Sequence, residues 1–409
     1  MSLRADANKI ITAALHSAMP DSAVRTALEQ ADFSGGRLIL VAAGKAAWQM
    51  AKTACDQLGS RIDSGVVITK YHHSKGPIGN LAIYEAGHPV PDGNSFLGTQ
   101  AAMDAVSGLT EADTVLFLLS GGGSALFEKP LIPEEDLDRL TRELLACGAD
   151  IVQINTVRKR FSAVKGGRFA QHVYPAKVFA IVLSDVLGDR LDMIASGPAY
   201  PDASTAEEAM SVVSKYNLTL TAQMRQLLEV ETPKVLTNVQ THVTGSVRQL
   251  CSAAEAVCRE LGYEPLVLTD RLCCTARDAG VFLGNIAQFY SGSGRKMAVI
   301  AGGETVVHLT GNGLGGRNQE LALAAAEGIS GLRACVFSLG SDGTDGPTDA
   351  AGAFVDGETS GVLRQQGVVI SDVLQNNDAY HALEKCGGLI ITGPTGTNVN
   401  DLSVVLIEG

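Results

Sequence analysis

The sequence predicts an α/β protein built from two α/β domains with mainly parallel sheets. Apolar runs of strand length alternate with amphipathic segments of helical length along the whole chain. This alternation is typical of parallel sheets that carry helices on both faces. The 409 residues also exceed the usual size of one domain. A new strand–helix–strand pattern begins after Glu231-Thr232-Pro233, so we expect domains at 1–232 and 233–409.

Charge and hydropathy narrow the classes of protein that fit this chain. The net charge is −12 and no basic stripe is present, so we expect no nucleic-acid partner. No apolar run approaches the ~18–20 residues that cross a bilayer, and the N-terminus lacks a secretory signal pattern. We therefore expect a cytoplasmic protein with no membrane partner. The eight cysteines show no zinc-binding spacing.

The first domain begins with amphipathic helical sequence and continues as strand–turn–helix units. Residues 5–31 predict one helix or two, with a break at Pro20, because proline disrupts a helix interior. Apolar runs bounded by turn residues predict strands at Arg37–Ala42, Val66–Thr69, Ala82–Ala86, Thr114–Leu119 and Lys177–Leu183. Helical apolar spacing predicts helices at Ala46–Leu58, Ser95–Ser107 and Pro133–Cys147, from Ile154 to near Arg168, and over roughly 205–230.

The second domain shows the same two patterns. Apolar runs predict strands at 234–239, 265–269, Met297–Ala301, Thr305–Leu309, 334–339, 388–392 and Leu402–Ile407. Amphipathic spacing predicts helices at 246–261, Thr275–Tyr290, Asn318–Ala326 and 372–385.

Polar and glycine-rich segments follow several of the predicted strands. They are Gly44-Lys45, Ser120–Ser124, Ser184–Asp189, Gly302-Gly303-Glu304 and Ser341–Asp349. Ligands bind open α/β sheets beyond the carboxyl ends of their strands. The convergence of these segments therefore predicts a ligand site more strongly than any one motif does.

The segment Ala301–Ala326 predicts an anion-binding corner. A strand, a glycine-crowded turn (Gly311–Gly316) and the start of a helix follow one another, so the unpaired N–H groups of the helix point back at the turn. Arg317 lies at that helix start with donors that suit a carboxylate or phosphate. The simpler alternative is a glycine turn beside a surface arginine.

Two segments of the first domain could also bind phosphate. Ser120–Ser124 could do so through backbone N–H groups, or could be only a tight turn between strand and helix. Lys45 could neutralise a phosphate as a point charge, or could be a solvated lysine. Basic residues could form a positive wall nearby, or could be a solvated helix face; they are Arg158, Lys159, Lys165 and Arg168.

Acidic loops offer candidate ligands for Mg²⁺. Asp185 and Asp189 could hold the metal, and one of them could accept a hydroxyl proton during phosphoryl transfer. Asp342, Asp345 and Asp349 suit magnesium or turn stabilisation. The three histidines His72, His73 and His88 show no metal spacing, and we interpret them as loop residues.

A match to the dinucleotide fingerprint G-x-G-x-x-G is weak. It runs from Gly311 to Gly316, but polar residues follow it where a dinucleotide-binding helix needs small apolar ones.

Several sequence blocks, taken together, resemble a known family. They include V-A-A-G-K-A-A (41–47), L-L-S-G-G-G-S-A-L (118–126), L-S-D-V-L-G-D (183–189), the glycine turn with R-N-Q-E-L (311–321), G-S-D-G-T-D-G-P-T-D-A-A-G (340–352) and T-G-P-T-G-T-N-V-N-D (392–401). The chain is similar, almost from end to end, to the glycerate 2-kinases whose C-terminal region is called the MOFRL domain. That region would span about 295–405 here.

The resemblance implies ATP-dependent phosphorylation of D-glycerate on its 2-hydroxyl with Mg²⁺, in a cleft between two domains. On this basis we expect Lys45, Arg317 and Asp189 to be catalytic, and Asp185 and Asp189 to bind the metal. We expect the nucleotide at Ser120, Gly121, Gly122, Gly123, Ser124, Gly303, Glu304, Asp342, Asp345 and Asn398. A homodimer is left open. The alternative activity is an NAD(P)H-dependent hydroxypyruvate reductase, for which the dinucleotide fingerprint is poorly formed.

Overall fold

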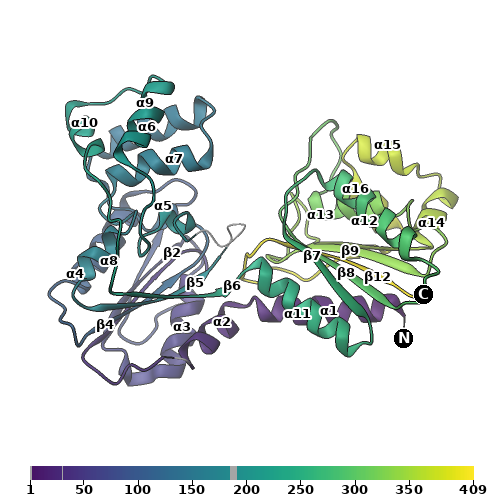
Figure 1. The fold of residues 1–409 in the computed structure, drawn as a ribbon, viewed down its shortest axis with the longest axis horizontal. Coiled ribbons are helices and arrows are strands. Elements are labelled where there is room, and N and C mark those ends of the chain that lie inside the picture. Colours follow the sequence, from purple (N-terminus) through teal and green to yellow (C-terminus); the bar gives the residue numbers. More distant parts are fainter. Residues whose placement is uncertain (1, 30, 185–190) are drawn as a thin grey trace. The chain divides into compact units, whose positions relative to one another are not determined.

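Residues 2–29, 31–184 and 191–409 are described in a computed structural model, and the chain forms two compact units (Figure 1). The N-terminal unit is Ala23–Thr244, and the C-terminal unit combines Met1–Ser22 with Gly245–Gly409. The predicted division at 232/233 differs from this one in two respects. The first helix packs with the C-terminal unit, and the strand that ends the N-terminal unit lies beyond residue 232.

The N-terminal unit is built on a six-stranded sheet. Its strands are β1 (Leu38–Ala43), β2 (Ser64–Lys70), β3 (Ala82–Ala86), β4 (Thr114–Leu119), β5 (Lys177–Leu183) and β6 (Val239–Gly245). They lie in the order β3-β2-β1-β4-β5-β6, and the pairs from β3 to β5 are parallel. The carboxyl ends of these strands therefore share one edge of the sheet.

Apolar side chains on both faces of this sheet are buried, as expected for a parallel sheet. Alternate residues of β1 enter two different cores: Val41 belongs to one cluster and Leu40 to the other. The helices of this part of the unit are α2 (Pro20–Leu28), α3 (Ala47–Leu58), α4 (Gly93–Ala105), α5 (Gly123–Leu126) and α8 (Arg168–Val173).

A helical module with its own apolar core extends from the sheet part of this unit (Figure 1). Its helices are α6 (Glu134–Ala146), α7 (Ile151–Arg158), α9 (Ala206–Lys215) and α10 (Ala222–Leu228). Leu140, Val157 and Met224 are fully buried in that core.

The C-terminal unit is built on a second six-stranded sheet. Its strands are β7 (Glu264–Leu272), β8 (Met297–Gly303), β9 (Ala334–Gly340), β10 (Gly352–Asp356), β11 (Leu389–Ile390) and β12 (Asp401–Ile407). The order is β11-β10-β9-β12-β8-β7, and only the β7–β8 pair is parallel. The two α/β domains are confirmed, but mainly parallel pairing holds for the first sheet alone. The last strand, β12, inserts antiparallel between β8 and β9.

Helices cover both faces of the second sheet. On one face α1 (Leu3–Ser17) packs against α11 (Val247–Glu260), and Tyr263 Oη donates a 2.9 Å hydrogen bond to buried Asp6. The remaining helices are α12 (Ala276–Tyr290), α13 (Arg317–Ala325), α14 (Thr359–Gln365), α15 (Ile370–Gln375) and α16 (Ala379–Lys385). No helix in the described part of the chain is long and apolar enough to cross a membrane.

Two strand predictions after residue 232 were wrong, and one strand was missed. Thr305–Leu309 is no strand: Val306 forms one isolated bridge, and Leu309 is 83% exposed. The strand predicted at 234–239 is β6, displaced to Val239–Gly245. Strand β10, which returns beside β9 after the Asp-rich loop, was not predicted.

Candidate active site

The turn after β4 presents a row of backbone N–H groups without partners. Gly122 has φ +85°, and the four-residue helix α5 begins directly after it. Within the described residues, the N–H groups of Gly121–Ser124 make no hydrogen bond. Successive free N–H groups at a turn form a concave site suited to an anion such as phosphate. We call Ser120–Ser124 the N–H cradle.

The loop after β1 is bonded directly to this cradle. Lys45 N donates to Gly121 O at 2.9 Å, and Ala46 N donates to Ser120 Oγ at 3.0 Å. Gly44 has φ +127°, and a Cβ there would lie 2.2 Å from Ser120 Oγ, so only glycine fits. The half-buried Lys45 side chain has no ion-pair partner among the described residues. Its charge is therefore available to a ligand beside the cradle.

A strained segment supports the cradle from the other side. Ala195 and Ser196 both have left-handed backbone, with φ +50° and +62°. A Cβ on Gly123 would lie 2.6 Å from Ala195 Cβ, and the hydroxyls of Ser124 and Ser196 are 3.2 Å apart. Such strain costs on the order of 1–3 kcal/mol per residue and concentrates at functional sites.

The predicted positive wall is not a ligand surface, because its cations bind groups of the protein itself. The ammonium of Lys165 is fully buried and donates to Ser124 O at 2.8 Å and to Phe127 O at 3.2 Å. It also lies 3.3 Å from Glu128 Oε2. Burial lowers the pKa of Lys165 to about 8. Lys165 therefore holds the carbonyls that follow the cradle.

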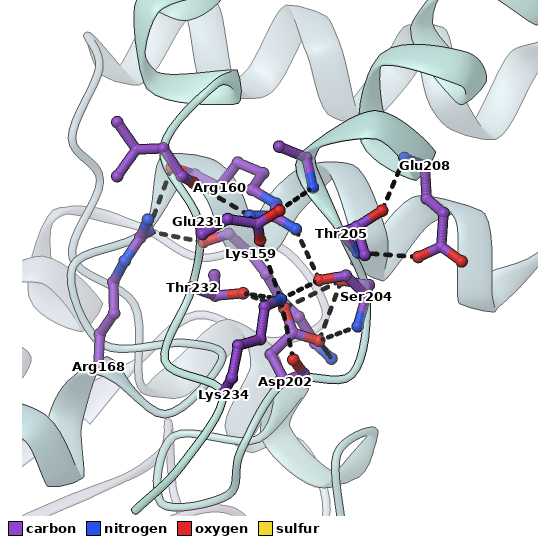
Figure 2. Close-up of polar contacts among 12 residues, drawn as sticks. Lys159, Arg160, Arg168, Asp202, Ser204, Thr205, Glu208, Glu231, Thr232 and Lys234 are labelled. Atoms are coloured by element: carbon purple, nitrogen blue, oxygen red, sulfur yellow. Dashed lines mark hydrogen bonds and ion pairs between the residues drawn. The ribbon is translucent and has the colours of Figure 1, made fainter.

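Lys159 and Arg168 are likewise used inside the fold, where the helical module joins the sheet part of the unit (Figure 2). Lys159 Nζ lies 3.1 Å from Asp202 Oδ1, and both side chains are buried. Asp202 also accepts from Thr232 Oγ1 at 2.8 Å. Arg168 donates to the backbone oxygens of Lys159 and Ser162. We interpret this network as structural.

In the C-terminal unit, the predicted site residues gather at one edge of the second sheet. Asp401 pairs in register with Gly303 on one side and with Gly340 on the other. Arg317 forms a two-point ion pair with Asp401, with Nε–Oδ2 at 2.6 Å and Nη2–Oδ1 at 2.9 Å. Its Nη1 lies 3.1 Å from Glu304 Oε1. The arginine is therefore held in one orientation by two carboxylates.

The anion-binding corner at the start of α13 already holds a carboxylate of the protein. Asp345 accepts from Asn318 N at 3.2 Å and from Gln319 N at 2.8 Å. Its side chain is buried, and burial raises its pKa to about 6, with a further increase from the charge of Asp401. Asp345 therefore occupies two donors of the predicted anion-binding corner, while the N–H group of Arg317 has no partner among the described residues.

The first part of the glycine turn before α13 is also bonded within the fold. Gly311 N donates to Asn377 Oδ1 at 2.9 Å, Gly313 N donates to Asn376 O at 2.9 Å, and Leu314 N donates to Asp378 Oδ1 at 2.9 Å. These contacts clamp the turn onto the junction of α15 and α16. These three N–H groups therefore serve packing, whereas those of Gly315 and Gly316 have no partner among the described residues.

The remaining predicted nucleotide contacts lie in loops of the same edge. Asp342 Oδ1 accepts from Thr344 N at 3.0 Å, which closes a turn after β9. Asn398 lies in the segment before β12, and Val399 N beside it donates to Ser341 Oγ at 2.8 Å. The loops after β9 and before β12 are therefore joined through Ser341.

The predicted magnesium ligands Asp185 and Asp189 lie outside the described residues. Within the described part of the chain, no group of three or more His, Cys, Asp or Glu side chains could hold a metal ion. Sequence reasoning missed Asp401, the partner of Arg317. Asp401 ends the T-G-P-T-G-T-N-V-N-D block, so that block carried the available signal.

The fold is that of an α/β protein with unpaired N–H groups at the carboxyl edge of a parallel sheet. Two family models match: "Domain of unknown function (DUF4147)" over residues 6–229, and the MOFRL family over residues 297–401.

Proteins of similar sequence and structure indicate the family. A D-glycerate 2-kinase of Thermotoga maritima is 52% identical, and the match covers 99% of each chain. A crystal structure of glycerate kinase from Thermotoga maritima has a TM-score of 0.96 at 52% identity, covering 99% of each chain. A protein of Agrobacterium vitis with the provisional name hydroxypyruvate reductase is 39% identical, over 91% of this chain and 100% of that protein. The chain belongs to the glycerate 2-kinase family with a C-terminal MOFRL region.

Proposed function

We propose that this protein transfers the γ-phosphoryl group of ATP to the 2-hydroxyl of D-glycerate, giving 2-phosphoglycerate and ADP. The observation that carries the proposal is the N–H cradle with Lys45 beside it. Phosphoryl transfer needs positioned donors and positive charge more than covalent chemistry. The N–H cradle supplies the donors and Lys45 supplies the charge. The N–H groups of Gly121–Ser124 would hold phosphate oxygens, and Lys45 would neutralise charge on the transferring group.

A physical feature of the cradle supports its fit to phosphate. Gly122 has no side chain, and a Cβ at that position would enter the space between Lys45 and His88. Absence of a Cβ lets phosphate oxygens approach the bare backbone.

Arg317 has a proposed role in the same reaction. Asp401 fixes its plane, while Glu304 is a half-exposed partner that an anionic ligand could displace. We assign Gly303, Glu304, Asp342 and Asn398 to nucleotide contacts. Asp345 supports them by fixing the start of α13. Mg²⁺, with Asp185 and Asp189 as its ligands, remains part of the proposal. Bound there, it would neutralise phosphate charge.

The test is a coupled assay for ADP with enzyme, D-glycerate and Mg-ATP. We expect Lys45→Ala to lower kcat by about 10²–10³-fold, the scale of one lost electrostatic donor. Arg317→Ala should do the same, with folding checked by circular dichroism because it also unpairs Asp401. The proposal fails if both folded variants keep the turnover of the unmodified enzyme.

A parallel assay with NADH and hydroxypyruvate distinguishes the competing activity. An NAD(P)H-dependent hydroxypyruvate reductase would oxidise NADH, seen as a loss of its absorbance, and would form no ADP from glycerate. In the glycine turn that resembles a dinucleotide fingerprint, the N–H groups of Gly311, Gly313 and Leu314 are bound to Asn376–Asp378, so these three are not available to a pyrophosphate. The proposal places the enzyme in the cytoplasm and leaves a homodimer open.

A further inference from the structure

His88 lies against the N–H cradle, although its sequence context marked it only as a loop histidine. It belongs to the loop that follows β3. A Cβ on Gly122 would be 3.0 Å from His88 Cδ2, 3.1 Å from His88 Nε2 and 3.2 Å from Lys45 Cγ. The loops after β1, β3 and β4 thus bring the imidazole, the free lysine and the cradle together within one unit.

The imidazole of His88 is not engaged by the fold. It is half-buried, and it makes no hydrogen bond to any residue that the structure describes. Its neighbour His73 differs, because His73 Nδ1 lies 3.1 Å from Lys45 O. His172 also differs, with Nε2 at 3.2 Å from Met103 O. A partly buried ring without a partner beside a ligand site is free to bond to the ligand.

The surroundings of His88 favour the uncharged ring. Burial lowers its pKa, and the positive charges of Lys45, Lys70 and His73 lower it further. The carboxylates in the adjoining segments are bonded elsewhere: Asp92 accepts from Tyr71 Oη at 2.8 Å, and Glu85 accepts from Ser74 N at 2.9 Å. An uncharged imidazole has a lone pair that can accept a proton.

We propose that His88 is a catalytic residue that takes the proton of the glycerate 2-hydroxyl during phosphoryl transfer. This inference rests on the proposed function. As the substrate oxygen forms its bond to the γ-phosphorus, the bond from that phosphorus to the bridging oxygen breaks, and ADP leaves with the electron pair. The hydroxyl proton passes to the free ring nitrogen of His88 and then to solvent. Lys45, whose Cγ lies near the same point beside Gly122 as the imidazole, offsets the negative charge of the transferring group.

The first test compares His88→Gln with a matched control, His172→Gln, in the ADP assay. General-base catalysis contributes roughly 10²–10⁴-fold, so we expect kcat of H88Q to fall by that order. We expect its KM for D-glycerate to change by less than about threefold, because binding energy and proton transfer are separate contributions. His172 is exposed and distant from the cradle loops in sequence, and H172Q should keep both constants.

Two further measurements separate catalysis from a structural role. Added imidazole should restore part of the activity of His88→Ala and none to Lys45→Ala. The acidic limb of the pH profile of kcat should disappear in H88Q. In the full-length protein without ligands, the NMR titration of His88 should move to higher pH in Lys45→Met, because a nearby positive charge is removed.

The outcomes discriminate between the two proposals. If the unmodified enzyme forms no ADP from D-glycerate, the proposed function fails and the role of His88 fails with it. If the enzyme is active but folded H88Q keeps its kcat and its acidic limb, the assignment of His88 alone is overturned. Lack of imidazole rescue in folded, inactive H88A would also overturn it, in favour of a role in packing.

Discussion

At the scale of single residues, burial decides what the charged side chains of this protein do. Arg317, Lys159 and Lys165 look alike in sequence as ligand-binding cations, yet each is bonded to groups of the fold. Lys45 keeps a free charge because no carboxylate of the described residues lies within ion-pair distance of it. Taking a charge out of water is costly unless it is paired, so the buried Lys159 and Lys165 have internal partners, whereas the partly exposed Lys45 remains available.

Asp345 gives a pH-dependent prediction. Its pKa is about 6 in the folded protein and about 3.9 in an unfolded chain, so the folded state binds the proton more tightly. The contribution of Asp345 to the free energy of unfolding is therefore fully present below pH 4 and is lost as the pH rises through 6. The free energy of unfolding of the unmodified protein, relative to Asp345→Asn, should therefore fall by about 2 kcal/mol between pH 4 and pH 7.

Urea unfolding across that pH range measures the difference. Asp349→Asn, at an exposed position of the same loop, is the matched control and should not show this change. A constant difference between the unmodified protein and D345N would show that Asp345 is ionised throughout, held charged by the N–H groups of α13.

At the scale of elements, the two glycine-rich turns that the sequence offers as anion sites differ in how far the fold uses their N–H groups. The turn before α13 has more glycines and an arginine, but the N–H groups of Gly311, Gly313 and Leu314 are bonded to Asn376–Asp378. The turn after β4 keeps its N–H groups unpaired and is braced by Ser196 and Lys165. A turn becomes a ligand site when its own fold leaves its donors free.

Gly122→Ala tests the cradle as an element. The residue has φ +85°, and the new methyl group would contact His88 and Lys45 at 3.0–3.2 Å. We expect kcat to fall at least about tenfold, together with a stability loss of roughly 1–2 kcal/mol from the left-handed backbone.

Gly148→Ala is the control, because Gly148 has a similar φ of +75° but nothing within 4 Å of a new Cβ. It should lose comparable stability and keep its activity. Equal losses of activity in both variants would show that backbone strain, rather than the geometry of the cradle, limits turnover.

At the scale of the whole molecule, the chain forms two units whose boundary does not follow the order of the sequence. Helix α1 comes from the N-terminal end but belongs to the C-terminal unit, where Ala7, Ile10 and Ala14 are buried in the core shared with α11. The last strand, β12, lies at the centre of the same sheet. Both ends of the chain are therefore needed to complete one core.

Ile10→Ala should destabilise the C-terminal unit by about 2–5 kcal/mol, the range for truncating a fully buried side chain. The single tryptophan, Trp48, lies in the N-terminal unit and reports on that unit alone. The midpoint of thermal unfolding followed by circular dichroism should therefore move to lower temperature. The midpoint followed by Trp48 fluorescence should not change. Thr12→Ala, on the exposed face of α1, is the control. An equal shift in both signals would mean that the two units unfold as one.

The sequence alone determined the alternating α/β pattern, strands β1 to β5 of the first sheet and the segments that form the cradle, because apolar periodicity and glycine turns are local signals. Strand direction in the second sheet was decided only in three dimensions, since the insertion of β12 between β8 and β9 depends on contacts between residues far apart in the chain. The same holds for the site. Whether Lys45 stays free, Asp345 fills a helix start or His88 reaches Gly122 depends on which distant groups become neighbours, and no local pattern records that.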